Sequence, residues 1–160
     1  MPYHILSAPC LRIIQDNNSG LTSLMDLVDT VPAGPNNKLT IPPFKLFSKW
    51  GKSLSGEEKE QFDIKLMLSG PSFSRKKQLD NFSVEIPEKA SGVTIILEMG
   101  AIDLDEAGLW FVHITYKMSS KRKWNEACVL PFMVQEKKQK NTEHQVQEGL
   151  AGTADVLSKS

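Results

Sequence analysis

The chain has 160 residues, of which 40% are hydrophobic and 24% are charged, as in an ordinary globular protein of one domain. Its 19 basic and 19 acidic side chains give a formal net charge of zero, so no overall positive charge attracts nucleic acid. There is no apolar run of the roughly 18 residues that a membrane span needs, and no signal-peptide pattern. We therefore expect a cytoplasmic protein.

The first third of the chain predicts strands that are separated by turn-forming residues. The apolar run 9–15 ends at the turn 16–20, and the run 21–31 follows it, which together predict a hairpin. The spacing in 21–31 also fits a helix, but the short turn favours a strand. Residues 38–50 predict a third strand, interrupted by the pair 42–43. Because proline cannot donate to a ladder, this pair is expected at a sheet edge or where a strand crosses between sheets.

The rest of the chain shows clear two-residue alternation up to residue 135. The five strands predicted there cover residues 62–68, 82–86, 93–99, 109–117 and 124–135. In strand 109–117, Trp110, Val112, Ile114 and Tyr116 are predicted to face the core. Eight strands at such spacing, without a helix, indicate an all-β sandwich or barrel.

The composition changes after Gln135. Residues 136–160 contain almost no large apolar side chains, which predicts a polar, disordered and flexible tail. The expected organisation is one β domain over residues 1–135 followed by this tail.

A short motif that begins at Asp105 indicates the class of sandwich. Glu106, Gly108 and Trp110 stand in the pattern that precedes the second cysteine of immunoglobulin domains, and Val112 stands at the cysteine position. The motif resembles the structural corner of immunoglobulin-like domains, with an indole N–H in place of the usual tyrosine hydroxyl.

The stretch 8–134 as a whole resembles a family of uncharacterised bacterial proteins of similar length. The shared outline is an opening strand and hairpin, a proline-containing third strand and the strand that holds Gly108 and Trp110. The resemblance implies an immunoglobulin-like antiparallel β-sandwich of about seven or eight strands. The family has no assigned activity to carry over.

Two features could carry catalysis or bind a metal. Asp103, Asp105 and Glu106 gather three carboxylates in one turn, which suits either a cation or general acid–base site or a solvated turn. The solvated turn is favoured, because aspartates cap backbone amides in turns. His113 faces outward on its strand, and a neighbouring strand could supply a nucleophile or carboxylate. A metal-dependent or hydrolytic enzyme that uses these residues is the first alternative function.

Other chemical signals are weak. The chain contains no phosphate-binding, dinucleotide-binding or serine-hydrolase motif, so we expect no catalytic residue, metal or cofactor. The cysteines, Cys10 and Cys128, lie in apolar runs and are expected to be buried rather than bridged.

Two basic turns define the second alternative, a nucleic-acid or nucleotide binder. Arg75–Lys77 lies near Phe73, and Lys121–Lys123 lies beside Trp124, so that aromatic rings could stack on bases. Solvated turns on a neutral protein are the favoured interpretation.

The segment Phe44–Trp50 provides the leading functional hypothesis. Phe44, Leu46 and Phe47 cannot all face one side of a regular strand, so the proline pair introduces a bulge or some apolar surface stays exposed. Exposed Phe44, Phe47 and Trp50 would form a partner-binding surface, whereas the alternative, which is slightly favoured, places all of them in the core. We therefore expect a non-catalytic interaction or scaffolding module that binds a protein partner. A homodimer through a sheet edge is a further expectation.

Overall fold

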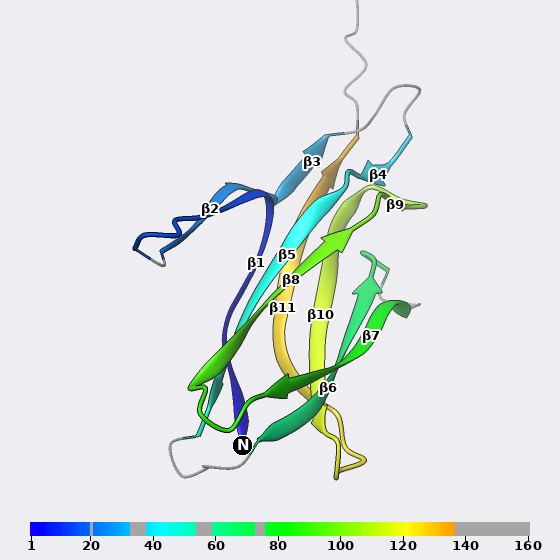
Figure 1. Ribbon diagram of the computed structural model, residues 1–160. Coiled ribbons are helices and arrows are strands. Elements are labelled where there is room, and N and C mark those ends of the chain that lie inside the picture. The colour runs from blue at the N-terminus through cyan, green and yellow to red at the C-terminus, as the bar shows by residue number, and fades with distance from the viewer. Residues whose placement is uncertain (20, 33–37, 54–58, 73–75, 137–160) are drawn as a thin grey trace, which may run out of the picture.

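The computed structural model describes residues 1–19, 21–32, 38–53, 59–72 and 76–136 (Figure 1). In these residues all regular secondary structure is β-strand, so the all-β prediction is confirmed. The strands are β1 (Pro2–Gln15), β2 (Thr22–Leu27), β3 (Thr30–Pro32), β4 (Thr40–Ile41), β5 (Phe44–Lys52), β6 (Glu60–Ser69), β7 (Lys76–Ile86), β8 (Gly92–Met99), β9 (Ile102–Asp103), β10 (Gly108–Met118) and β11 (Asn125–Gln135). Apart from Glu136, the predicted tail lies outside the described residues.

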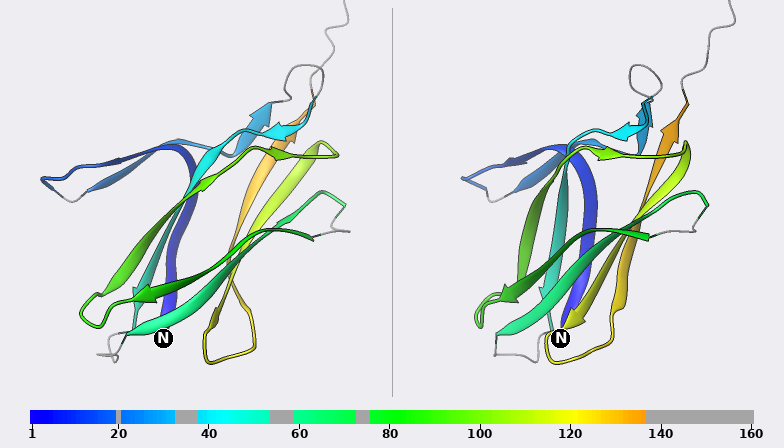
Figure 2. Two further views of the ribbon diagram at one scale, coloured as in Figure 1. Left: turned by 45° about the vertical axis from the view of Figure 1, so that its right-hand side comes forward. Right: turned by 90° about the vertical axis from the view of Figure 1, so that its right-hand side faces the viewer.

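The strands form two larger sheets that face one another (Figures 1 and 2). The four-stranded sheet has the order β2-β1-β5-β8, and the five-stranded sheet has the order β3-β11-β10-β6-β7. The five-stranded sheet is curled (Figure 2). Strands β4 and β9 form a small separate pair. Neighbouring strands in the described residues run antiparallel except β3 and β11, which run parallel.

Aromatic side chains between the sheets form the centre of the core. Trp50 of the four-stranded sheet packs against Phe62 and Tyr116 of the five-stranded sheet, with ring centroids 5.0 and 5.2 Å apart. Phe44 packs on Phe132 in the same way, at 5.5 Å. Since each contact joins one sheet to the other, these rings hold the two layers together.

The alternation in the sequence identified the core faces of β6 and β10 correctly. The residues of these strands that are buried as predicted are Phe62, Ile64, Leu66, Leu68, Trp110, Val112 and Ile114. Apart from the buried Ser69, their neighbours along each strand are more exposed, because successive side chains of a strand point to opposite faces.

The predicted strand 21–31 is divided between the two sheets. Its first part is β2, which pairs with β1 as the predicted hairpin, and its second part is β3, which pairs with β11. Asp26 has a positive φ of 56°, at the point where the chain begins to leave the first sheet. The amide of Met133 then bonds the carbonyl of Asp29 at 2.7 Å and starts the pairing in the second sheet.

The predicted strand 38–50 is divided at Pro42 and Pro43, as expected for a strand that crosses between sheets. Before the prolines, Thr40 and Ile41 pair with β9. After them, β5 becomes a central strand between β1 and β8. The proline pair therefore ends one set of ladder bonds and lets the next begin.

A buried chain of hydrogen bonds joins β1 to β5. Ser7 Oγ donates to Ser48 Oγ at 2.7 Å, and Trp50 Nε1 donates to the same oxygen at 2.8 Å. His4 Nε2 lies 2.8 Å from Ser7 Oγ, and its ring packs edge-on against Trp50. Because the Ser7 hydroxyl donates its hydrogen to Ser48, the Ser7 oxygen acts as the acceptor towards His4, and His4 must donate from Nε2. The sequence pattern did not predict residues 2–8 of β1, because His4 and Ser7 put polar side chains at positions opposite Trp50 and Ser48, where an apolar alternation would be expected.

Replacing Ser48 by alanine should destabilise the fold by about 2 kcal/mol, because the buried indole N–H of Trp50 and the hydroxyl of Ser7 both lose their acceptor. Urea unfolding measures the loss. Ser120→Ala, in an exposed turn, is the control and should change the free energy of unfolding by less than about 0.5 kcal/mol. Equal effects of the two substitutions would contradict a structural role for the buried chain.

His4 should make the fold less stable in mild acid. Burial lowers its pKa from the ordinary value of 6.5, against a smaller opposing effect of a hydrogen bond with the backbone of Leu6. The unfolded chain therefore binds a proton at a pH where the folded chain does not, and stability falls as the pH drops through 6.5 towards the folded pKa.

We expect His4→Gln to lose less stability than the native chain between about pH 7.5 and about pH 5.5 in urea unfolding experiments. Asp16, Asp63 and Asp103 have pKa values lowered below 3.8 by hydrogen bonds from side-chain hydroxyls, so their contribution is lost only at lower pH. Parallel pH dependences of the two proteins would show that His4 is not responsible.

Candidate functional site

The sequence of the segment Phe44–Trp50 allowed an exposed apolar surface, but the segment does not form one. Phe44, Phe47 and Trp50 are 4%, 6% and 0% exposed, so the expectation of an exposed patch at these residues is wrong. The physical reason for Phe44 and Trp50 is that they point between the two sheets, where their rings pack against aromatic rings of the five-stranded sheet. Phe44 and Trp50 face the core, whereas Phe47 points to the opposite side of the sheet.

Phe47 marks a different surface, the outer face of the four-stranded sheet. Directly opposite residues of antiparallel strands share a face, and Phe47 lies between Ala8 of β1 and Ile96 of β8. The same registers place six large apolar side chains on this face, each between 38% and 62% exposed. These residues, which we call the outer-face cluster, are Tyr3, Leu6, Ile14, Met25, Leu27 and Ile96.

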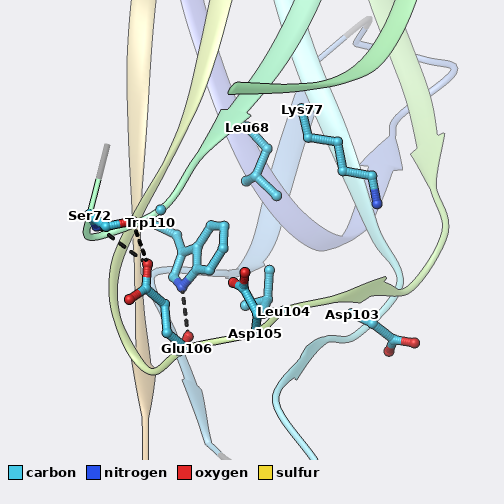
Figure 3. A pocket seen from close by; sticks show the side chains of 9 residues that line it. Leu68, Ser72, Lys77, Asp103, Leu104, Asp105, Glu106 and Trp110 are labelled. Atoms are coloured by element: carbon cyan, nitrogen blue, oxygen red, sulfur yellow. Dashed lines mark hydrogen bonds between the residues drawn. The ribbon is translucent and has the colours of Figure 1, made fainter. Parts of the chain in front are cut away.

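A second site lies at one end of the sheets, where the turn before β10 meets the turn after β6. The indole Nε1 of Trp110 donates to the carbonyl oxygen of Glu106 at 3.0 Å (Figure 3). The Glu106 carboxylate accepts bonds from the Ser72 amide at 3.3 Å and hydroxyl at 3.1 Å. Gly108 has a φ of +125°, which favours glycine. The turn is therefore fixed by Trp110 and joined to its neighbour through Glu106.

A pocket of about 450 Å³ lies beside this corner (Figure 3). It is lined by Leu68, Gly70, Ser72, Lys77, Asp103, Leu104, Asp105, Glu106 and Trp110. The pocket thus brings Lys77, from one of the predicted basic turns, near the predicted acidic turn. In the sequence these turns are separate features, because the pairing of β6 with β7, which brings them together, is not visible in the local pattern.

The three carboxylates of the acidic turn do not converge on one point. Asp103 accepts a hydrogen bond from the Thr40 hydroxyl at 2.9 Å and forms an ion pair with Lys38 at 3.2 Å. Both contacts lower the pKa of Asp103, and the hydrogen bond from Thr40 has the larger effect. Glu106 is held by Ser72. Within the described residues, His, Cys, Asp and Glu side chains nowhere form a group of three that could hold a metal ion. Of the carboxylates in the turn, Glu106 caps a backbone amide, that of Ser72, whereas Asp103 accepts from a side-chain hydroxyl.

His113 has two hydrogen-bonding partners on neighbouring strands, which the sequence alone could not identify. Its Nε2 lies 2.8 Å from Ser69 Oγ, and its Nδ1 lies 3.2 Å from a carboxylate oxygen of Glu126. The order hydroxyl, imidazole, carboxylate is that of a serine hydrolase. A nucleophile must be reachable, however, and here Ser69 is 0% exposed while the Glu126 side chain is 57% exposed. This pattern of exposure suits a structural bridge between β6, β10 and β11.

The partners of His113 were missed for two separate reasons. Ser69 lies one residue beyond the predicted end of its strand. Glu126 reaches the histidine because the register between β10 and β11 shifts between Ile114 and Thr115. Such a bulge leaves no periodic signal in the sequence.

The two basic turns lie at opposite ends of the five-stranded sheet. The strand β6 runs from Phe62, beside the Lys121–Lys123 turn, to Ser69, beside Lys76, a span of roughly 23 Å. Arg75 and Phe73 lie outside the described residues. The basic turns therefore do not form one continuous patch.

Trp124, the aromatic neighbour of the second basic turn, already has cationic partners. The ammonium group of Lys65 lies 4.2 Å from the ring centroid, and that of Lys117 lies 5.2 Å from it. A base that stacked on this ring would compete with these contacts.

The cysteines are free thiols. Cys10 lies on the outer side of the four-stranded sheet, where its Sγ contacts the carbonyl oxygen of Lys45 at 3.6 Å. Burial is the main cause that raises the pKa of both Cys10 and Cys128. Both therefore stay protonated near neutral pH, and neither has the thiolate character of a nucleophile.

Comparison of the chain with protein-family models and with curated proteins finds no match. Across the part of the chain that the structure describes, there is no helix of the length and apolar character required to cross a membrane. The case for a function therefore depends on the surfaces and clusters of this structure.

Gly108→Ala should destabilise the fold by about 1–3 kcal/mol, because the φ of +125° is strained for any other residue and an added Cβ would lie 2.8 Å from Pro71 Cγ. Gly100→Ala is the matched control, since nothing lies within 4 Å of a Cβ there and its φ is not left-handed. Thermal unfolding of both variants compares them. A loss of stability at Gly100 equal to that at Gly108 would contradict the described corner.

Proposed function

We propose that this chain is an immunoglobulin-like β-sandwich that serves as a non-catalytic protein-interaction module of the bacterial cytoplasm. In this proposal β11, β10, β6 and β7 correspond to the G, F, C and C′ strands of a variable-type domain, and β1, β5 and β8 to the A, B and E strands. The indole bond to Glu106 takes the place of the tyrosine corner, which supports this assignment. The resemblance to a bacterial family is the basis for the proposed source.

The observation that carries the functional proposal is the outer-face cluster. Its six large apolar side chains spread over β1, β2 and β8 around Phe47 and belong to one face of one sheet. Single exposed apolar residues are common on protein surfaces, but a contiguous group of them marks an interaction site. The proposal therefore moves the binding surface from Phe44–Trp50, as the sequence suggested, to the residues around Phe47.

The hydrolase alternative is less well supported, because the Ser69 hydroxyl is the most buried member of its hydrogen-bonded group. The nucleic-acid alternative is less well supported because the basic turns are far apart on a neutral chain. The pocket beside Trp110 is lined by Lys77 and by three carboxylates, of which Asp103 and Glu106 are already bonded within the chain, so it does not favour an anionic ligand.

Photo-crosslinking tests the proposed surface directly. A benzophenone amino acid at Ile96 should give protein adducts in extracts of the native host, whereas the same group at Asn81, exposed on β7 of the other sheet, should not. An excess of unlabelled native chain should suppress the Ile96 adducts, and the Leu27→Glu chain should suppress them less. Equal adducts from both positions, or none from Ile96, would contradict an interaction through this face.

A further inference from the structure

We infer that the protein bound on the outer face is a second copy of this chain, stacked face to face about a two-fold axis. The inference rests on the proposed function and adds the partner and the geometry to it. It differs from the dimer expected from the sequence, which would pair the edges of two sheets. The area, the charges and the shape of the exposed surface each support it.

The amount of exposed apolar surface suits a dimer of ordinary size. A fully buried Leu or Ile side chain is worth 1.5–3 kcal/mol at about 25 cal/mol/Å², so each such side chain covers roughly 60–120 Å². The six members of the outer-face cluster, each about half exposed, then offer roughly 200–350 Å² of apolar surface. A standard interface buries roughly 800 Å² per partner, of which a little over half is apolar. The cluster alone therefore supplies roughly half to three-quarters of that apolar share.

Most charges on this face are paired. Lys45 pairs with Glu98 at 3.3 Å, and Arg12 pairs with Asp26 at 2.7 Å, while Lys49, which the register places on the same face, adds one positive charge. A two-fold axis places a surface against its own copy, and a surface of one sign would repel itself. Two neutral pairs and a single further lysine on a chain of zero net charge keep that repulsion small.

The β1–β2 hairpin shows why a second copy is needed to cover this face. The hairpin projects from the two facing sheets (Figures 1 and 2), and because the pairing of β1 with β5 ends at Cys10, Ile14 and Met25 lie beyond β5, with Leu27 at the last paired row. In a face-to-face dimer each hairpin can lie across the outer face of the other copy. The arrangement buries the exposed side chains of the hairpin and of Ile96 together.

Edge pairing would not achieve this. Strands that pair edge to edge continue a sheet and leave both of its faces as exposed as before. The edge strand β2 also contains Asp26 at a φ of +56°, an irregularity of the kind that prevents edges from pairing. Face-to-face stacking is therefore the arrangement that accounts for the exposed residues of the outer-face cluster, whereas Leu109, Val129 and Met133, exposed on the five-stranded sheet, lie outside it.

Light scattering and sedimentation of the purified full chain over a range of concentrations test the inference. The native chain should sediment at twice the monomer mass of 17.9 kDa. Leu27→Glu and Ile96→Glu each place a charge in the stacked face and should weaken the dimer by at least roughly tenfold. Leu109→Glu, on the five-stranded sheet, is the control because Leu109 is as exposed as Ile96, at 37% against 39%, and it should leave the mass unchanged.

The three substitutions affect exposed side chains, and circular dichroism should show that all variants keep the native fold. A native chain that stays monomeric at every concentration would overturn the second copy as partner. Crosslinking of Ile96 to a different protein would in that case still support the proposed function. A dimer that survives both outer-face substitutions, or that Leu109→Glu dissociates, would overturn the face-to-face geometry.

Discussion

The structure depends on one constraint, which is that the central strand β5 buries apolar side chains on both of its faces. Phe44, Leu46 and Trp50 pack into the core between the sheets, and Phe47 is covered on the other side. A central strand of this kind needs neighbours on both edges and a layer on both faces. Strands β1 and β8 pair with the two edges of β5, and the five-stranded sheet covers its core face. On the outer face, only side chains of β1 and β8 lie over Phe47. The incomplete outer layer is the origin of the proposed interaction surface.

The polar groups of the described structure serve the fold in a consistent way. Ser48 receives two donors in the core, Glu106 joins two turns, and His113 connects three strands through Ser69 and Glu126. In each case the side chain that could act as a nucleophile, an acid or a base is already hydrogen-bonded within the chain. Apolar contact through the outer-face cluster is therefore the basis of the proposed association with protein.

The sequence was informative where one residue type decides the local geometry. Alternation located β6 and β10 because each has one buried and one more exposed face, and the prolines at 42 and 43 marked a crossing because they cannot bond in a ladder. It failed where the decisive contact is distant. The outward direction of Phe47 depends on its place between Ala8 and Ile96, and the contact of His113 with Glu126 depends on a bulge. Neither can be read from neighbours in the chain.

Hydrogen exchange as a function of protein concentration measures most directly whether the outer face is covered. If two copies stack through this face, the amides of β2 and of the second half of β1 should exchange more slowly as the concentration rises, while those of β6 and β10 should not change. Exchange in β2 that is independent of concentration, or slowed only in the five-stranded sheet, would contradict the account.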